Sequence, residues 1–188
     1  MKKFIAAMVF LVSCLCLSFT PTAYAATQVE LNEMYGSQGL LNAYNEEIEW
    51  DYKVLAYLSV QDRGRPNVTT YEAASMNGMG FRADQNGQGY VSEAYIIAPD
   101  SFSRGNIEHI AYHLLCAANF YGANWNIIEH PNLYNESLSI KMMQTANKAI
   151  RQTEEAQIYY NPIMERYYSL MIGHVDHYWL IGVSAWVK

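Results

Sequence analysis

The segment from Tyr178 to Val187 is the feature that most constrains the fold. Both of its alternating sets of side chains are largely apolar: Trp179, Ile181, Val183 and Ala185 form one set, and Tyr178, Leu180 and Trp186 belong to the other. A strand that is apolar on both faces is expected in the interior of a sheet that helices cover. The rest of the chain must therefore supply neighbouring strands and helices that pack on them.

The hydrophobic periodicity of the rest of the chain predicts both helices and strands. Apolar residues recur at helical spacing over residues 40–61, 106–121 and 136–158. Asn161-Pro162 predicts a further short helix, because proline fits a first turn. Alternation over residues 90–98 and a short apolar stretch around Phe81 predict two strands, with Asn86-Gly87 as the turn between them. The chain is therefore expected to be α+β, with helices packed around a small sheet.

Residues 1–25 have the form of a signal peptide. Lys2 and Lys3 precede an apolar run that ends at Phe19, and Ala23-Tyr24-Ala25 has the small-x-small form that a signal peptidase cleaves. The run is shorter than the roughly 20 residues that a membrane-spanning helix usually needs. We therefore predict that the mature chain, residues 26–188, is a single domain that is secreted or periplasmic.

Leu11-Val12-Ser13-Cys14 offers a competing interpretation of the leader. If this stretch were a lipobox, a diacylated Cys14 would hold the protein on a membrane. The apolar run continues past Cys14 to a good cleavage site, which favours release without a lipid anchor and no stable membrane insertion.

The composition of the mature chain limits its partners. The whole sequence has a formal net charge of −6, and the leader removes two lysines but no acidic residue. This balance argues against nucleic acid and anionic membrane surfaces as partners. Only Cys116 follows the leader, so no disulfide within the mature chain is possible. Sixteen tyrosines and four tryptophans predict an aromatic core in preference to an aromatic-lined groove.

Three potential metal ligands share one face of the helix predicted over residues 106–121. His109, His113 and Cys116 follow at spacings of four and three residues, and imidazole and thiolate groups are good ligands for zinc or copper. Further potential ligands lie close in sequence: Glu108, Glu129 and His130. The alternative is a buried contact with hydrogen-bonded histidines and Cys116 as a small hydrophobe. The HxxxH pattern lacks the glutamate of HExxH, which favours this alternative.

A second cluster, His174-Val175-Asp176-His177, directly precedes the final strand. Two histidines with an aspartate between them could bind a metal or hold a general base. The alternative is a polar surface loop. Because no third ligand can be identified from the sequence, the loop is the preferred interpretation.

Other catalytic groups are poorly supported by the sequence. No Gly-x-Ser-x-Gly nucleophile elbow occurs, and Cys116 in the middle of a partly apolar helix is expected to be an inert thiol. Glu93 is the one charged residue in the strand predicted over residues 90–98. It points either at water or into a cleft, where burial would raise the pKa of its carboxyl group.

Four segments, in order, resemble the CAP superfamily of secreted proteins, which comprises cysteine-rich secretory proteins, antigen 5 and pathogenesis-related proteins. Gly39-Leu40-Leu41, leading into a helix with Ala56, resembles the opening helix. Residues 92–96 resemble the Gly-Glu-Asn-Ile strand, and residues 149–161 a later helix. Residues 166–172 and 180–183 resemble the His-Tyr-Thr-Gln-Val-Val-Trp segment and the closing Ile-Gly-Val-Gly strand. These matches cover roughly a third of the mature chain.

The resemblance implies a three-layer α/β/α sandwich with a small central sheet, and an extracellular binding module more readily than an enzyme. The family's cleft holds two histidines and two acidic residues that can bind a divalent cation. Glu93 matches its strand glutamate, but Arg166 stands at the position of its second histidine, and residues 100–134 have no counterpart. The ligand cleft implied for this chain comprises Glu93, Arg166, Tyr167, His174 and His177. Arg166 is expected to repel a cation and to pair with Glu93.

Two functions follow from these observations. The preferred one is a CAP-like binding module with no catalytic residue and no cofactor, whose aromatic cleft near Glu93 holds a small apolar or cell-envelope ligand. The alternative is a metal-dependent hydrolase of the cell envelope. Its zinc or other divalent cation would be bound by histidines from both clusters: His109, His113, His174 and His177.

The position of the cleavage site makes the first testable prediction. The exported protein should begin at Ala26 and carry no lipid, because the small-x-small site precedes this residue. Intact-mass measurement on protein recovered after export checks this. A species that begins at Cys14 with added acyl mass would contradict it.

Overall fold

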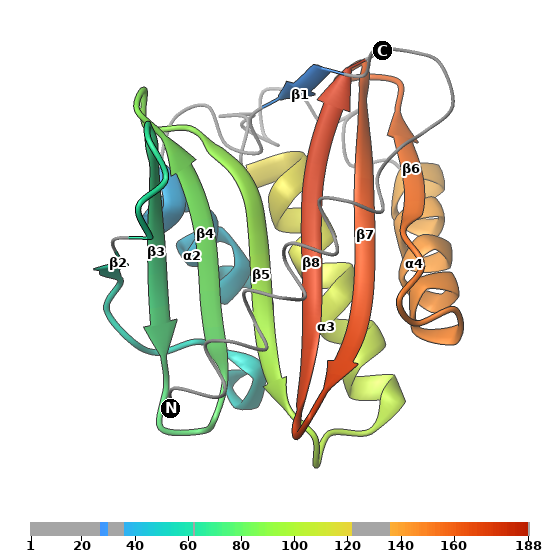
Figure 1. Cartoon of the computed structure of the whole chain (residues 1–188). Helices are drawn as coiled ribbons and strands as arrows, with labels where there is room; N and C mark the ends of the chain where they lie inside the picture. Colours follow the sequence, from blue (N-terminus) through green and yellow to red (C-terminus); the bar gives the residue numbers. More distant parts are fainter. Residues whose placement is uncertain (1–26, 30–35, 62, 122–135, 188) are drawn as a thin grey trace.

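The computed structural model describes residues 27–29, 36–61, 63–121 and 136–187 (Figure 1). The predicted signal peptide, with Cys14, therefore lies outside the described residues. The described part contains helices and strands in the order β1, α2, η1, β2, β3, β4, β5, α3, η2, α4, β6, β7 and β8. None of the described helices is long and apolar enough to cross a membrane.

Eight strands form one sheet in which every neighbouring pair is antiparallel. The strands are β1 (Thr27–Val29), β2 (Ser59–Gln61), β3 (Val68–Ala74), β4 (Gly80–Asn86), β5 (Val91–Pro99), β6 (Gln157–Asn161), β7 (Arg166–Val175) and β8 (Tyr178–Val187). Their order is β2-β3-β4-β5-β8-β7-β6, with β1 paired to β8 beside this path. Two meanders, one before and one after the helices α3 and α4, thus meet where β5 pairs with β8.

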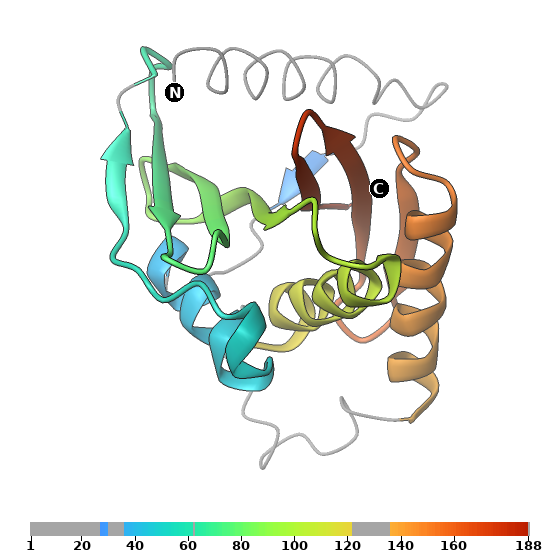
Figure 2. The same ribbon diagram turned by 90° about the horizontal axis from the view of Figure 1, so that it is seen from below.

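The described helices cover one face of this sheet. They are α2 (Gly36–Glu47), η1 (Trp50–Tyr52), α3 (Arg104–Cys116), η2 (Ala117–Tyr121) and α4 (Glu136–Arg151). Figure 2 shows α2, α3 and α4 together on the same side of the strands. The predicted α+β class is therefore confirmed. The sheet is larger than expected, and the described helices form a single layer on it.

The final strand lies in the interior of the sheet, as its two-sided apolar pattern predicts. Ile181 and Val183 are buried in the main core beneath α3. Leu180 alternates to the other face, where it packs with Ile97 in a smaller apolar cluster. Each alternating set of β8 therefore has its own apolar environment, although the described helices cover only one face.

The prediction of one helix over residues 40–61 is wrong beyond Glu47, because α2 ends at this residue. The Asn45 side chain forms two hydrogen bonds with the backbone of Val54, donating from Nδ2 to the carbonyl oxygen and accepting from the N–H, both at 2.9 Å. Such side-chain bonds offer the backbone an alternative to the helix. The chain therefore folds back, and Ala56, expected in the family's opening helix, lies beyond α2.

The helix expected over residues 136–158 also ends early, at Arg151. Residues 157–161 alternate between buried and exposed side chains and form β6. The short helix expected after Asn161-Pro162 is absent. Instead, Asn161 Oδ1 accepts hydrogen bonds from the N–H groups of Ile163 (2.9 Å) and Met164 (3.2 Å), which closes the turn between β6 and β7.

The interior position of β8 predicts a large cost for removing a side chain from its core-facing set. Ile181 is 0% exposed, so Ile181→Ala should lower the free energy of unfolding by about 2–5 kcal/mol. Ile158, which is 61% exposed on β6, provides the matched control, and Ile158→Ala should cost below about 1 kcal/mol. Urea denaturation of both variants measures the difference. Equal effects would contradict the interior placement.

Candidate functional site

Helix α3 presents two histidines one turn apart. The helix begins with a capping box, in which Ser103 Oγ accepts a hydrogen bond from the Asn106 N–H (3.2 Å) and Asn106 Oδ1 accepts one from the Ser103 N–H (3.0 Å). His109 and His113 follow on one side of the helix, and their rings meet edge to face with centroids 4.4 Å apart. The predicted helical spacing of these two histidines is thus confirmed.

Glu49, from a distant segment, joins the two histidines. It lies in the link between α2 and η1, and its Oε2 is 2.5 Å from His109 Nε2. One potential ligand atom from each of Glu49, His109 and His113 lies within 4.8 Å of the others. Among the described residues, this is the one group of three side chains whose ligand atoms lie close enough together to hold a metal ion.

Tyr52 holds the link that carries Glu49 against α3. Its ring contacts the ring of His109, with centroids 5.8 Å apart, and its hydroxyl oxygen accepts a hydrogen bond from Asn106 Nδ2 at 2.5 Å. Its backbone carbonyl accepts a hydrogen bond from the buried Tyr44 hydroxyl (3.0 Å). The position of Glu49 is therefore determined by contacts on both sides of the link.

The electrostatics of this group favour the protonation states that bind a metal. Burial, together with the positive charge that His109 can carry, lowers the pKa of His113, and this favours the neutral imidazole. The hydrogen bond with His109 lowers the pKa of Glu49, which favours the carboxylate. A neutral imidazole and a carboxylate are the forms in which these side chains are ligands.

Cys116, the third member of the cluster predicted from the sequence, does not join this group. It is buried in the main core, and burial raises the pKa of its thiol to about 12. It is therefore a small hydrophobe, as the alternative interpretation held. Glu108 accepts a hydrogen bond from Asn147 Nδ2 on α4 (2.8 Å), while Glu129 and His130 lie outside the described residues.

Glu93 and Arg166, expected to pair, project from opposite faces of the sheet. Glu93 lies in one register row with Asp84 and Ser184, on the face opposite the described helices. Arg166 is paired in register with Asn161, whose side chain bonds to Asn119 on the helical side. Because side chains alternate across a strand, the expected ion pair between Glu93 and Arg166 is wrong.

Glu93 instead lies among polar side chains on the face opposite the described helices. Its Oε2 accepts a hydrogen bond from the Tyr95 hydroxyl (2.9 Å), and burial, followed by the charge of Glu93, raises the pKa of that hydroxyl. In the next strand, buried Asp84 accepts a hydrogen bond from Thr70 Oγ1 (2.8 Å) and forms an ion pair with Arg65 (2.7 Å). These bonds offset the free-energy cost of burying the Asp84 carboxylate, so their role is structural.

The histidines of the second cluster lie at the far end of the β7–β8 hairpin. His174 Nε2 is 2.6 Å from Asp100 Oδ1, and its ring contacts that of Trp179, with centroids 4.6 Å apart. His177 is exposed in the turn, and its backbone carbonyl accepts a hydrogen bond from the Asp100 N–H (3.1 Å). Eight residues of extended β7 separate His174 from Arg166, a distance of roughly 26 Å. The five predicted cleft residues therefore do not share one cleft.

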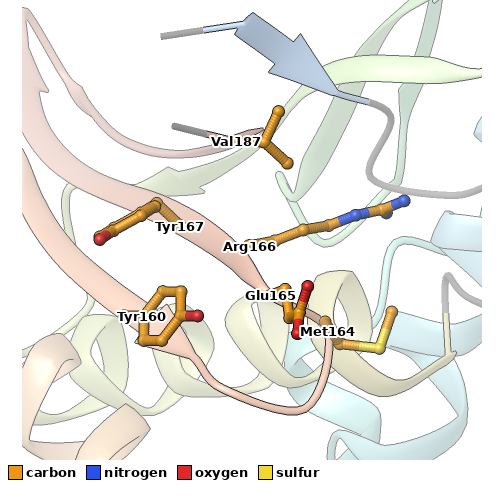
Figure 3. A pocket seen from close by; sticks show the side chains of 6 residues that line it. All are labelled: Tyr160, Met164, Glu165, Arg166, Tyr167 and Val187. Atoms are coloured by element: carbon orange, nitrogen blue, oxygen red, sulfur yellow. The ribbon is translucent and has the colours of Figure 1, made fainter. Parts of the chain in front are cut away.

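Arg166 and Tyr167 do line a pocket at the rim of the sheet, where β7 begins (Figure 3). The pocket has a volume of about 500 Å³, and its lining is Tyr160, Met164, Glu165, Arg166, Tyr167 and Val187. The two side chains leave β7 in opposite directions (Figure 3). The Tyr167 ring lies between the rings of Tyr160 and Trp186, with centroids 4.7 Å and 5.9 Å away.

Comparison with protein-family models, curated proteins and solved structures finds no match to this chain.

The shifted pKa of His113 can be measured directly. Its folded-state pKa should lie below the usual value of about 6.5, because burial disfavours the imidazolium. NMR titration of the imidazole C–H signals gives this pKa. Since the charge of Glu49 raises the pKa of His113, Glu49→Gln should lower it further. A pKa above about 6.5, or a rise in the variant, would contradict the described surroundings of His113.

Proposed function

We propose that the mature protein is an exported binding module without catalytic activity, acting outside the cell or in the periplasm. The form of residues 1–25 supports export. The observation that carries the binding function is the rim pocket, whose lining includes both Arg166 and Tyr167. Its lining combines aromatic and apolar side chains with an arginine and a glutamate, which suits a ligand that has both apolar and charged parts.

The lining of the rim pocket limits the chemistry of its ligand. Tyr160, Tyr167 and Val187 offer aromatic and apolar surface, while Arg166 offers a permanent cation with several donors. Glu165 adds a carboxylate at the same rim. A cell-envelope component with an apolar part and both acidic and basic groups, such as a peptidoglycan fragment, fits this combination best.

The same lining supports a non-catalytic role. A guanidinium is always protonated near neutral pH, so Arg166 is suited to anchoring a ligand and not to proton transfer. Among the described residues that line the pocket there is no histidine, cysteine or serine, and Glu165 is the one carboxylate.

Membership of the CAP superfamily remains part of this proposal. Two of the four matched segments coincide with strands: residues 92–96 lie in β5, and the two parts of the last segment, residues 166–172 and 180–183, lie in β7 and β8. The family's three-layer α/β/α sandwich is proposed on the same basis, with α2, α3 and α4 supplying one helical layer. The match to the later helix is weaker, because residues 149–161 divide between α4 and β6.

A metal-dependent hydrolase of the cell envelope is the second candidate. It is favoured by the group of Glu49, His109 and His113, because three protein ligands leave a fourth zinc position for a water molecule. His174 and His177 lie at the hairpin turn with Asp100 and are not proposed as ligands of that group.

Binding of soluble peptidoglycan fragments tests the rim pocket. NMR titration should show saturable shifts of residues in the pocket, and Arg166→Gln should weaken binding about 10-fold or more, because a charge-assisted hydrogen bond is lost. Arg104→Gln, which changes an exposed arginine at the start of α3, is the matched control.

Chromatography of the same mixtures, with and without added zinc, should find the fragments intact. Zinc-dependent cleavage would contradict the proposed binding module and support the metal-dependent hydrolase. Binding that is equal in both arginine variants would place the ligand elsewhere.

A further inference from the structure

The group formed by Glu49, His109 and His113 has the features of a built site. Its members come from two segments that lie sixty residues apart in sequence. The segments are docked on each other through Tyr52, which contacts His109 and bonds to Asn106. This docking uses an edge-to-face aromatic contact and a part-buried hydrogen bond, and these contacts hold the segment of Glu49 beside the two histidines.

The separations within this group are close to those of a coordinated ion. Zinc binds imidazole nitrogen at about 2.0–2.1 Å and carboxylate oxygen at about 2.0–2.2 Å, so two ligand atoms of a tetrahedral ion lie about 3.3 Å apart. The ligand atoms of Glu49, His109 and His113 lie within 4.8 Å of one another, and the closest pair is at 2.5 Å. Glu49 is exposed and the two histidines are half-buried, so rotation of these side chains can bring the ligand atoms to the separation that an ion needs.

A second observation concerns hydrogen bonding at His113. Its Nδ1 is buried and has no hydrogen-bond partner among the described residues. A buried polar atom without a partner carries a free-energy cost, and such atoms in a native structure call for an explanation such as an ion. The carboxylate of Glu47, which acts on His113 electrostatically, adds a second negative charge near the group.

We infer that Glu49, His109 and His113 bind a divalent transition-metal ion, with zinc as the best fit. Two imidazole nitrogens and one carboxylate oxygen suit zinc, copper or nickel, whereas calcium and magnesium prefer oxygen ligands alone. The side chain of Glu49 is 64% exposed, so an ion could reach the group from solvent. The site is separate from the rim pocket and does not depend on it.

Binding would change the local structure in a defined way. The ion would replace the hydrogen bond between Glu49 and His109 and hold their ligand atoms about 3.3 Å apart. It would also tie the link between α2 and η1 to α3. An ion that binds only the folded chain stabilises it by mass action, so zinc should raise the melting temperature in a concentration-dependent manner.

Calorimetric titration of the chelator-treated protein with zinc chloride tests this inference. One zinc per chain is expected, unaffected by excess magnesium chloride. Loss of a partner outside the coordination shell typically costs 10–100-fold in metal affinity, so loss of a ligand in His113→Ala should cost at least about 100-fold. Glu49→Gln, at an exposed position, should also weaken binding while leaving the fold unchanged, as circular dichroism would show.

His174→Ala is the matched control, because this histidine is also bonded to a carboxylate but lies outside the group. Its zinc affinity should equal that of the unmodified protein. If His113→Ala does not fold, Glu49→Gln and His109→Gln decide the outcome. The inference is overturned if the unmodified protein shows no saturable zinc binding, if Glu49→Gln and His109→Gln bind zinc as tightly as it does, or if only His174→Ala loses binding. Failure of the peptidoglycan titration would leave this result unchanged.

Discussion

The pairing of β5 with β8 is the contact on which the rest of the structure depends. It joins two antiparallel meanders, and the register runs from Glu93 opposite Ser184 to Pro99 opposite Tyr178. Bringing these strands together closes a long loop that contains α3 and α4, which costs chain entropy. Burial of Ile96 against Ile181, on the face beneath α3, supplies apolar surface that offsets this cost.

The seating of α3 on β5, β7 and β8 also positions the candidate metal group. The inner side of the helix is fully apolar, with Ile107, Ala111 and Leu114 buried in the core. His109 and His113 are consequently left at the margin, where η1 packs. The three potential ligands thus lie where the margin of α3 meets the segment that carries Glu49. There the imidazole of His113 is partly desolvated, while Glu49 stays accessible.

The tyrosines and tryptophans serve two purposes that composition could not separate. Tyr44 and Tyr168 are buried in the core, in agreement with the preferred interpretation of the aromatic content. Tyr160, Tyr167 and Trp186 instead form a row across β6, β7 and β8 that ends at the rim pocket. Whether a tyrosine packs inside or lines the rim depends on its parity in the strand and on the strand's place in the sheet.

The sequence by itself determined the features that depend on local periodicity: the α+β class, the interior position of β8, and the common face of His109 and His113. These follow from side-chain spacing within one element, which needs no knowledge of the rest of the chain. The end of α2 was decided by Asn45 bonding the Val54 backbone, a bond between side chain and main chain that periodicity does not register. Tertiary structure alone decided that Glu49 lies beside His109 and that Glu93 and Arg166 point to opposite faces. Such relations depend on docking and on strand register between segments far apart in sequence, where a shift of one residue reverses the face of every side chain.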